Sequence, residues 1–258
     1  MHLGISSRTL KGLRRIPALW GAASELDRMV AVHTGRRLNK WKHYFEIYDR
    51  HFSRFRGREI SVLEIGVADG GSLEIWRRYF GPKARIVGLD INPDCKAFES
   101  PGTQTCPGTH VAIGNQGDPK FLERLADEFG PFDIVIDDGS HAYDHQITTF
   151  RTLFRHIKED GIYACEDLCS SYWKAEYGGG VRAPGTFVEF LKELIDEMNA
   201  WFWRDKVEAD PGALANSMHG IHFYSTLVVI ERRAMQKPII TPVGRTRDVA
   251  HPPGAVRS

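Results

Sequence analysis

The sequence predicts an α/β fold built on a doubly wound, mostly parallel sheet, and three observations support this prediction. Short apolar runs typical of buried strands alternate with segments whose apolar residues recur at helical steps. Several of the strand-like runs end in glycine or acidic residues. The last two apolar runs lie too close together for a helical crossover, so we expect an antiparallel hairpin at one end of the sheet.

Seven strands are expected, with helices between most of them. The predicted strands are 60–65, 85–90, 110–113, 132–137, 161–165, 222–224 and 227–231. The predicted helices between them are 73–80, 119–129, 144–157 and 184–203. Each strand segment is a short apolar run, and the last helix is long and amphipathic, which favours packing of one of its faces against the sheet.

The chain divides into three expected parts. Residues 1–57 are predicted as an N-terminal helical extension, because Leu38, Trp41, Tyr44 and Tyr48 recur at helical steps, and Trp41 is expected to pack in the core. Residues 58–235 should form the sheet domain. Residues 236–258 are rich in proline, glycine and arginine and are expected to be extended or disordered. With 258 residues, of which 42% are hydrophobic, one core is expected and not a second full domain.

Charge and cysteine usage narrow the class of protein. The formal net charge is only +1, and the excess of basic residues before Arg58 favours a solvated helical face over a nucleic-acid surface. The four cysteines form no C-x-x-C pair, and Cys165 lies in an apolar run, as a buried thiol in a reducing cytoplasm would. We see no apolar stretch that could span a bilayer, so the expected location is cytoplasmic.

A glycine-containing segment, 64–72, follows the first predicted strand. Ligands of open α/β sheets bind at that edge, and Gly66 and Gly70 would let the backbone turn tightly beside one. The spacing differs from G-x-G-x-x-G, and nearby acids disfavour a pyrophosphate. Glu64 could instead receive an ammonium group, as in S-adenosylmethionine (SAM). Ser72 closes the segment, although the glycines could also form a simple turn.

Two later strand ends support the same ligand. Asp90 ends the second predicted strand, where an acid can accept hydrogen bonds from both ribose hydroxyls. The segment 114–118 follows the third strand, and its Gln116 is expected beside the adenine. The glycine segment alone is a weak signal, whereas the segment together with Asp90 indicates a nucleoside-containing cofactor.

Acidic residues gather at the ends of the fourth and fifth strands. Asp138, Glu166 and Asp167 should meet there, because these strands are expected to be neighbours about 4.8 Å apart. Clustered carboxylates repel one another unless a cation lies between them, and oxygen ligands select Mg²⁺ over zinc. His141, three residues beyond Asp138, could take a proton from a metal-bound hydroxyl. The alternative is a set of helix caps with His141 as a loop residue, but the whole set favours a metal site.

Aromatic side chains are the candidates for acceptor binding. Tyr172 and Trp173 follow the acidic pair and precede three glycines, which suits a substrate lid, although a packed loop fits equally well. Tyr44 could fold over the cofactor from the N-terminal part. We expect His219 and His222 to be structural histidines with satisfied hydrogen bonds.

Four segments, 64–72, 88–90, 132–141 and 166–167, closely resemble the macrolide sugar O-methyltransferases. Rhamnosyl O-methyltransferases and cephalosporin hydroxylase-like proteins form related groups. The resemblance extends from about Asn39 to Arg232, and D-D-G-S-H followed by E-D is its most specific part. It implies a class I, SAM-dependent and Mg²⁺-dependent methyltransferase.

The resemblance also implies residue roles. Asp138, Glu166 and Asp167 would hold Mg²⁺, His141 would be the catalytic base, and Asp137 would lie beside SAM. Asn115 stands where the family often has aspartate, which weakens the adenine assignment there. Larger members assemble tetramers through an extra N-terminal domain, whereas this chain has only a short helical extension, so any homo-oligomer is expected to differ from theirs. A smaller relative methylates a mannose unit in mycobacterial polymethylated polysaccharide synthesis.

The expected function is therefore methyl transfer to a sugar hydroxyl. A catechol-like or polyketide hydroxyl is an alternative acceptor that the sequence leaves open. A nucleic-acid methyltransferase is disfavoured, because no Asn-Pro-Pro-Tyr type base-flipping motif is present. A non-catalytic partner of the same fold is disfavoured by the intact acids and His141.

Overall fold

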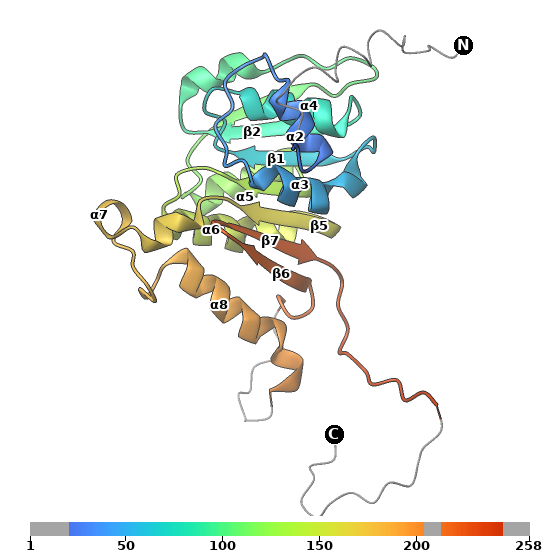
Figure 1. Ribbon diagram of the computed structural model, residues 1–258, viewed down its shortest axis with the longest axis vertical. Coiled ribbons are helices and arrows are strands. Elements are labelled where there is room, and N and C mark those ends of the chain that lie inside the picture. Colours follow the sequence, from blue (N-terminus) through green and yellow to red (C-terminus); the bar gives the residue numbers. More distant parts are fainter. Residues whose placement is uncertain (1–20, 204–212, 245–258) are drawn as a thin grey trace, which may run out of the picture.

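The computed structural model describes residues 21–203 and 213–244 and centres on one seven-stranded sheet (Figure 1). The strand order is β3-β2-β1-β4-β5-β7-β6, with β7 antiparallel to both of its neighbours, β5 and β6. The strands are β1 (Ser61–Ile65), β2 (Arg85–Asp90), β3 (Thr109–Ile113), β4 (Phe132–Asp137), β5 (Ile157–Cys165), β6 (Met218–Tyr224) and β7 (Leu227–Arg232). The predicted fold class, with its C-terminal hairpin, is confirmed.

Helices cover both faces of the sheet (Figure 1). The α-helices are α2 (Glu25–Ala31), α3 (Tyr44–Phe52), α4 (Gly71–Phe80), α5 (Pro119–Phe129), α6 (Tyr143–Leu153), α7 (Lys174–Tyr177) and α8 (Phe187–Met198). Short 3₁₀ turns are η2 (Ser53–Phe55), η3 (Pro93–Phe98), η4 (Phe154–His156), η5 (Leu168–Tyr172) and η6 (Ala200–Phe202). The residues of α2–α4 form one core with the sheet, and those of α5, α6 and α8 form the other.

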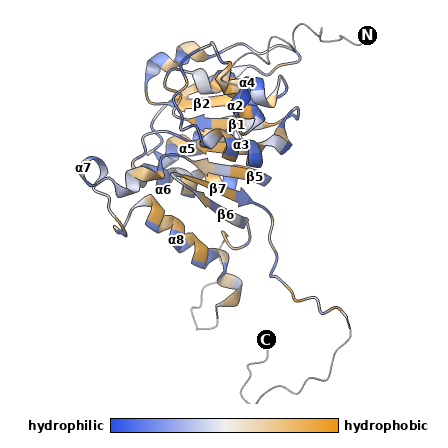
Figure 2. Cartoon of the chain, in the orientation of Figure 1, coloured by the Kyte–Doolittle hydropathy of each residue, from blue (hydrophilic) through white to orange (hydrophobic). Residues whose placement is uncertain are grey.

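The alternation of side chains along the strands builds these two cores. In β1, Val62 faces the first core and Leu63 faces the second, because successive side chains point to opposite faces. Both faces are covered, so the central strands are hydrophobic on each side, and Figure 2 shows their hydrophobic colouring. Rows of apolar and polar residues on α8 allow it to pack one face while the other meets solvent.

Local signals explain several element boundaries. Pro119 opens α5 behind Asp118, whose side chain accepts a hydrogen bond from the Lys120 amide at 2.9 Å. The predicted helix 144–157 ends earlier, at Leu153, and continues as the η4 turn. The predicted helix 184–203 is likewise shorter, because α8 ends at Met198 before η6. β5 begins at Ile157 instead of 161, with a register irregularity against β4.

The N-terminal part departs from the prediction. Residues 32–43 contain no helix, so the helical period that includes Leu38 and Trp41 is misleading there. The backbone carbonyls of Arg36 and Arg37 instead lie against Gly71, where a Cβ would be 2.5 and 2.2 Å from them. This contact requires an extended crossing over the cofactor edge of the sheet, and tertiary packing overrides the local periodicity.

Three other expectations can be checked. All four cysteines are free thiols, and Cys165 is buried as predicted. Residues 236–244 form no helix or strand and lead away from the sheet, while 245–258 lie outside the described residues (Figure 1). None of the helices that the structure describes combines the length and apolar character that a bilayer crossing requires.

Candidate active site

The turn after β1 packs directly against the turn after β4. Gly66 has φ +90°, and a Cβ there would lie 1.9 Å from the backbone oxygen of Asp138. The Asp138 amide donates to the Ile65 carbonyl at 2.9 Å and fixes the two turns together. Only glycine fits this position. Because Gly66 has no side chain, the predicted cofactor turn can lie directly against the turn that carries the predicted metal ligand Asp138.

Asp90 holds the same turn from the end of β2. Its Oδ2 accepts hydrogen bonds from the amides of Val67 and Ala68 at 2.8 and 3.0 Å, and its Oδ1 accepts from Asn92 at 2.8 Å. Oδ2 already accepts two hydrogen bonds, whereas Oδ1 has a second lone pair for a further donor. The expected contact of Asp90 with ribose hydroxyls therefore stays a prediction that this geometry permits.

A cleft of about 370 Å³ lies between these turns, within the range of cofactor and small-ligand sites. Its walls come from the ends of β1, β2, β3, β4 and β5 and from the loop before α3. Six predicted site residues line it: Gly66, Asp90, Gln116, Asp138, His141 and Asp167.

Asp138, His141 and Asp167 come together at one side of the cleft. One potential ligand atom from each lies within 4.8 Å of the others. His141 Nε2 is 3.6 Å from Asp167 Oδ2, and His141 Nδ1 is buried without a hydrogen bond among the described residues. His141 and Asp167 have φ values of +56° and +54°, a backbone strain typical of functional sites.

A buried lysine, which the sequence analysis assigned to a solvated basic face, lies among the acids. Lys40 Nζ is 2.7 Å from Asp138 Oδ2, 2.6 Å from Glu166 Oε1 and 3.2 Å from Glu64 Oε1, with only 2% of its side chain exposed. Burial opposes the charge of Lys40, but the three carboxylates outweigh it and raise its pKa well above the ordinary value. The expectation of a solvated face is wrong for this residue.

Glu166 shares the Lys40 ammonium with Asp138. Its Oε1 accepts from Lys40 and, at 2.5 Å, from Tyr48. Burial raises the pKa of Glu166, although the Lys40 ammonium opposes this rise. Both contacts use Oε1, so Oε2 is the atom that could still face a metal ion.

Glu64 and Ser72 form a buried pair behind the glycine turn. Ser72 Oγ donates to Glu64 Oε2 at 2.5 Å, and Lys40 approaches the other oxygen. Burial raises the pKa of Glu64, whereas Lys40 lowers it. The protein therefore places its own ammonium at Glu64, where the sequence analysis expected that of the cofactor.

Asp137 and Gln116 are joined beneath the cleft. Gln116 Nε2 donates to Asp137 Oδ1 at 2.9 Å, and Tyr163 Oη donates to Asp137 Oδ2 at 3.0 Å. Gln116 Oε1 accepts from the Ser140 amide at 2.7 Å. Burial raises the pKa of Asp137, and the two side-chain donors counteract that rise. Gln116 thus fixes Asp137 and the turn that carries His141.

The predicted aromatic residues occupy different environments. Tyr44 Oη donates to Asp167 Oδ1 at 3.1 Å, so it touches the acidic group. Trp41 is 54% exposed and donates to the same oxygen at 2.9 Å, so the prediction of core packing is wrong for Trp41. Tyr172 and Trp173 are about half exposed on η5 and at its end, outside the lining of the cleft, and their acceptor role stays a prediction.

Lys40 is the functional residue that the sequence analysis missed. It precedes β1 by about twenty residues, and no spacing rule connects it with strand ends that far away. The available signal was electrostatic, because Glu64, Asp138 and Glu166 together require a buried cation.

Comparison with known proteins supports the same interpretation. A methyltransferase domain family matches residues 63–168. The chain is 39% identical over 234 residues to the 8-demethyl-8-(2-methoxy-alpha-L-rhamnosyl)-tetracenomycin-C 3'-O-methyltransferase of Streptomyces olivaceus, covering 85% of this chain and 58% of that protein. It is 37% identical over 195 residues to the mycinamicin VI 2''-O-methyltransferase of Micromonospora griseorubida, covering 72% and 47%.

A solved structure shows the same fold. The MycE methyltransferase from the mycinamycin biosynthetic pathway, in complex with Mg and SAH, aligns with a TM-score of 0.69 at 34% identity. The alignment covers 83% of this chain and 55% of that one, so the chain spans about half the length of these relatives.

The strand order and the matched residues define an α/β domain of the methyltransferase fold. Over most of its length the chain is similar to these sugar O-methyltransferases, of whose length it spans about half.

Proposed function

We propose that this chain transfers the methyl group of SAM to a hydroxyl of a sugar or glycoside, with Mg²⁺ at the acidic cluster. The observation that carries the proposal is the convergence of Asp138, His141 and Asp167 on a cleft whose other wall contains Gly66 and Asp90. The similar proteins add support, because they are named as O-methyltransferases of a rhamnosyl-tetracenomycin and of mycinamicin VI.

The acidic residues fit Mg²⁺ by donor type and by charge. Asp138 and Asp167 offer carboxylate oxygens within 4.8 Å of each other, and Glu166 offers Oε2. Carboxylate oxygens are the ligands that this hard cation prefers. Lys40 offsets only part of the negative charge, so a divalent cation would still be attracted. These three acids are the proposed ligands.

Bound Mg²⁺ would lower the pKa of an acceptor hydroxyl in the cleft. His141 Nε2 faces the acids and would remove the proton of that hydroxyl. Most of the rate gain of such a transfer would come from holding the acceptor oxygen in line with the methyl donor. The positioning of His141 by its strained turn serves this geometry.

The proposed acceptors are small glycosides or oligosaccharides, and not nucleic acids. The exposed rings of Tyr172 and Trp173 could stack on sugar faces at the outer side of the site. A mannose unit of a methylated polysaccharide is one member of this acceptor class. We also propose that the chain forms a homo-oligomer.

The test is incubation with labelled SAM, Mg²⁺ and a panel of rhamnosides, mannosides, macrolide glycosides and catechols, followed by mass spectrometry. Label on a sugar oxygen supports the proposal. Label on catechols alone would show that the acceptor is a catechol and not a sugar. Full transfer activity in EDTA would show that no metal ion is needed. An RNA sample in the panel tests whether a nucleic acid can serve as the acceptor, and no label on RNA is expected.

A further inference from the structure

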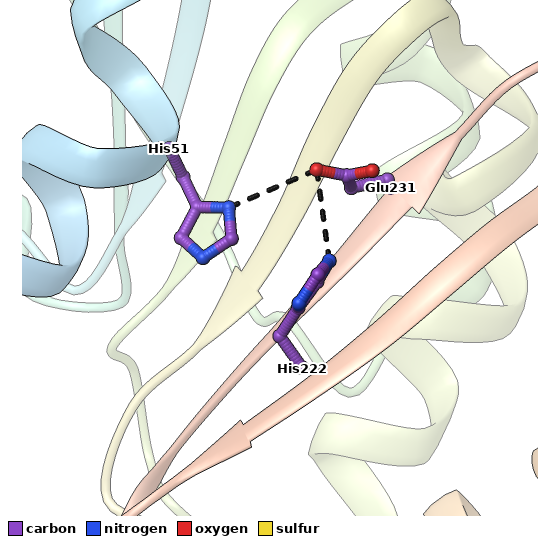
Figure 3. Close-up of side chains that lie close together, drawn as sticks. All are labelled: His51, His222 and Glu231. Atoms are coloured by element: carbon purple, nitrogen blue, oxygen red, sulfur yellow. Dashed lines mark ion pairs between the residues drawn. The ribbon is translucent and has the colours of Figure 1, made fainter.

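Two histidines and a glutamate form a second cluster, which shares no residue with the acidic cluster of the cleft (Figure 3). His51 comes from the last turn of α3, His222 from β6 and Glu231 from β7. One potential ligand atom from each lies within 4.8 Å of the others. The cluster therefore joins the helix that borders the active site to the C-terminal hairpin.

The distances within this cluster are longer than hydrogen bonds. Glu231 Oε1 lies 3.8 Å from His51 Nδ1 and 3.6 Å from His222 Nε2 (Figure 3). His222 Nε2 is buried and has no hydrogen-bond partner among the residues that the structure describes. The expectation that His222 has satisfied hydrogen bonds is therefore wrong, and a buried polar atom of this kind requires an explanation.

The other nitrogen of His51 has a partner that can set the tautomer. His51 Nε2 lies 2.8 Å from the Tyr224 hydroxyl. When Nε2–H donates to this hydroxyl, Nδ1 carries the free lone pair and faces Glu231. Histidine ligands of metals usually donate their remaining N–H in this way.

The surroundings of His51 favour a neutral ring. Burial is the largest cause that lowers its pKa, to about 4, and His222, Arg50 and Arg54 add to this effect while Glu231 opposes it. The neutral imidazole is the form that binds metal ions.

The hairpin leaves room between the ligands. Gly220 is paired with Glu231 across the two strands and stands two residues before His222 on the same face of β6. A Cβ at Gly220 would lie 3.5 Å from His222 Nε2. Glycine thus keeps this side of the cluster open.

We propose that His51 Nδ1, His222 Nε2 and Glu231 Oε1 bind a divalent transition-metal ion such as Zn²⁺, with water in the remaining position. A tetrahedral zinc ion has bonds of roughly 2.0–2.2 Å, which puts its ligands roughly 3.3–3.6 Å apart. The two distances to Glu231 Oε1, 3.6 and 3.8 Å, need to contract by only a few tenths of an ångström, and the two imidazole nitrogens lie within 4.8 Å of each other before any metal binds. Imidazole ligands favour such an ion over Mg²⁺, the ion proposed for the cleft.

The metal would connect α3 to the hairpin. Tyr44 and Tyr48, on the same helix, contact Asp167 and Glu166. His51 follows Tyr44 by seven residues, or about 10 Å along the helix axis. Fixing the end of α3 to β6 and β7 would therefore stabilise the tyrosines that hold the acids of the active site.

The test is a titration of chelator-treated full-length protein with Zn²⁺ by calorimetry, and with Co²⁺ by visible absorption, which is intense in tetrahedral sites. The variants are His222→Ala and Glu231→Gln, because both side chains are partly exposed and their replacement should preserve the fold. His219→Ala is the matched control, since His219 is an exposed histidine on the same strand outside the cluster. An Asp138→Asn/Asp167→Asn variant removes metal binding at the cleft.

The wild type should bind one Zn²⁺ that Asp138→Asn/Asp167→Asn and His219→Ala retain. His222→Ala and Glu231→Gln should each weaken that binding at least about tenfold and abolish the cobalt absorption. Equal zinc affinity and stoichiometry in the wild type, His222→Ala and Glu231→Gln would overturn the proposal, as would no zinc binding by the folded wild type. Neither readout depends on methyl transfer, so failure here leaves the proposed function untouched.

Discussion

Lys40 Nζ lies 2.6 Å from Glu166 Oε1, and this contact links the loop before α3 to the end of β5 across 126 residues of sequence. The same ammonium also contacts Asp138, at the end of β4. The cation that balances the acids therefore comes from the segment that closes over the cofactor edge. The position of the loop before α3 therefore determines whether the Lys40 ammonium lies beside these acids.

Replacing Lys40 with methionine should destabilise the fold by about 3–5 kcal/mol, because it leaves buried carboxylates without their cation. Added Mg²⁺ should recover more stability in this variant than in the wild type. Urea unfolding with and without Mg²⁺ measures both effects. Lys42→Met, an exposed lysine two residues later, is the control and should change little. Equal stability of the two variants would contradict the role of Lys40 as a buried counter-ion.

His141→Ala should reduce turnover by about 10²–10⁴-fold and leave SAM affinity nearly unchanged, because the residue acts on the acceptor proton. Steady-state rates and calorimetric binding of SAM separate these quantities. His156→Ala, at a histidine paired with Glu123 on the surface, should retain full activity. Unchanged turnover in His141→Ala would exclude it as the base.

Asp167→Asn should lower Mg²⁺ affinity and activity together, because it removes one carboxylate of the proposed metal site. It also weakens the acceptor of the Trp41 and Tyr44 hydrogen bonds, so circular dichroism should accompany the assay. Asp69→Asn is the control. It changes an exposed acid of the glycine turn, and the activity of this variant should depend on Mg²⁺ as that of the wild type does. An Asp167→Asn enzyme with the wild-type response to Mg²⁺ would argue against this ligand.

Gly66→Ala should be far more damaging than Gly57→Ala. Both glycines have positive φ values, +90° and +71°, so both substitutions carry backbone strain. Only at Gly66 would the new Cβ meet a backbone oxygen, at 1.9 Å, whereas nothing lies within 4 Å at Gly57. We expect a loss of about 1–2 kcal/mol for Gly57→Ala and a larger loss, with impaired SAM binding, for Gly66→Ala. Denaturant unfolding and SAM calorimetry of both variants provide the comparison, and equal losses would count against this packing.

In the metal-free protein, the free energy of unfolding should decrease as the pH falls, because His51 is protonated more readily in the unfolded chain than in the fold. The pKa of His51 is about 4 in the fold and about 6.5 when unfolded, so the unfolded chain gains a proton between these values while the fold does not. The stability present above about pH 6.5 is therefore lost as pH falls toward 4, by about 3 kcal/mol at most. His51→Gln should show a flatter profile of unfolding free energy. His222, Glu231, Arg50 and Arg54 act on the same ring and must remain unchanged in this comparison. The same pH slope in both proteins would contradict the assignment.

The sheet was predictable because its signals are local. The apolar strands, the capped helices and the short link between β6 and β7 can each be predicted from residues that are neighbours in the sequence. Asp138 and Asp167 follow the ends of two strands that are neighbours in the parallel part of the sheet, which brings these acids together. The boundaries of α6, α8 and β5 differed from prediction, because the ends of elements depend on packing as well as sequence.

The crossing of residues 32–43 was not predictable from helical periodicity. The path of that segment is determined by the contact of Arg36 and Arg37 with Gly71 and by the burial of Lys40 among acids that are distant in sequence. The pairing of His51 with His222 and Glu231 has the same origin, since α3 and the hairpin are remote in sequence.

The sequence by itself determined the order of strands and helices, the glycine turn and the residue types at the strand ends. Only the tertiary structure decided which charge neutralises which, placing Lys40 among three carboxylates and leaving His222 without a hydrogen-bond partner among the described residues. Periodicity acts between neighbours along the chain, whereas burial and electrostatic pairing depend on distances that exist only after the chain has folded.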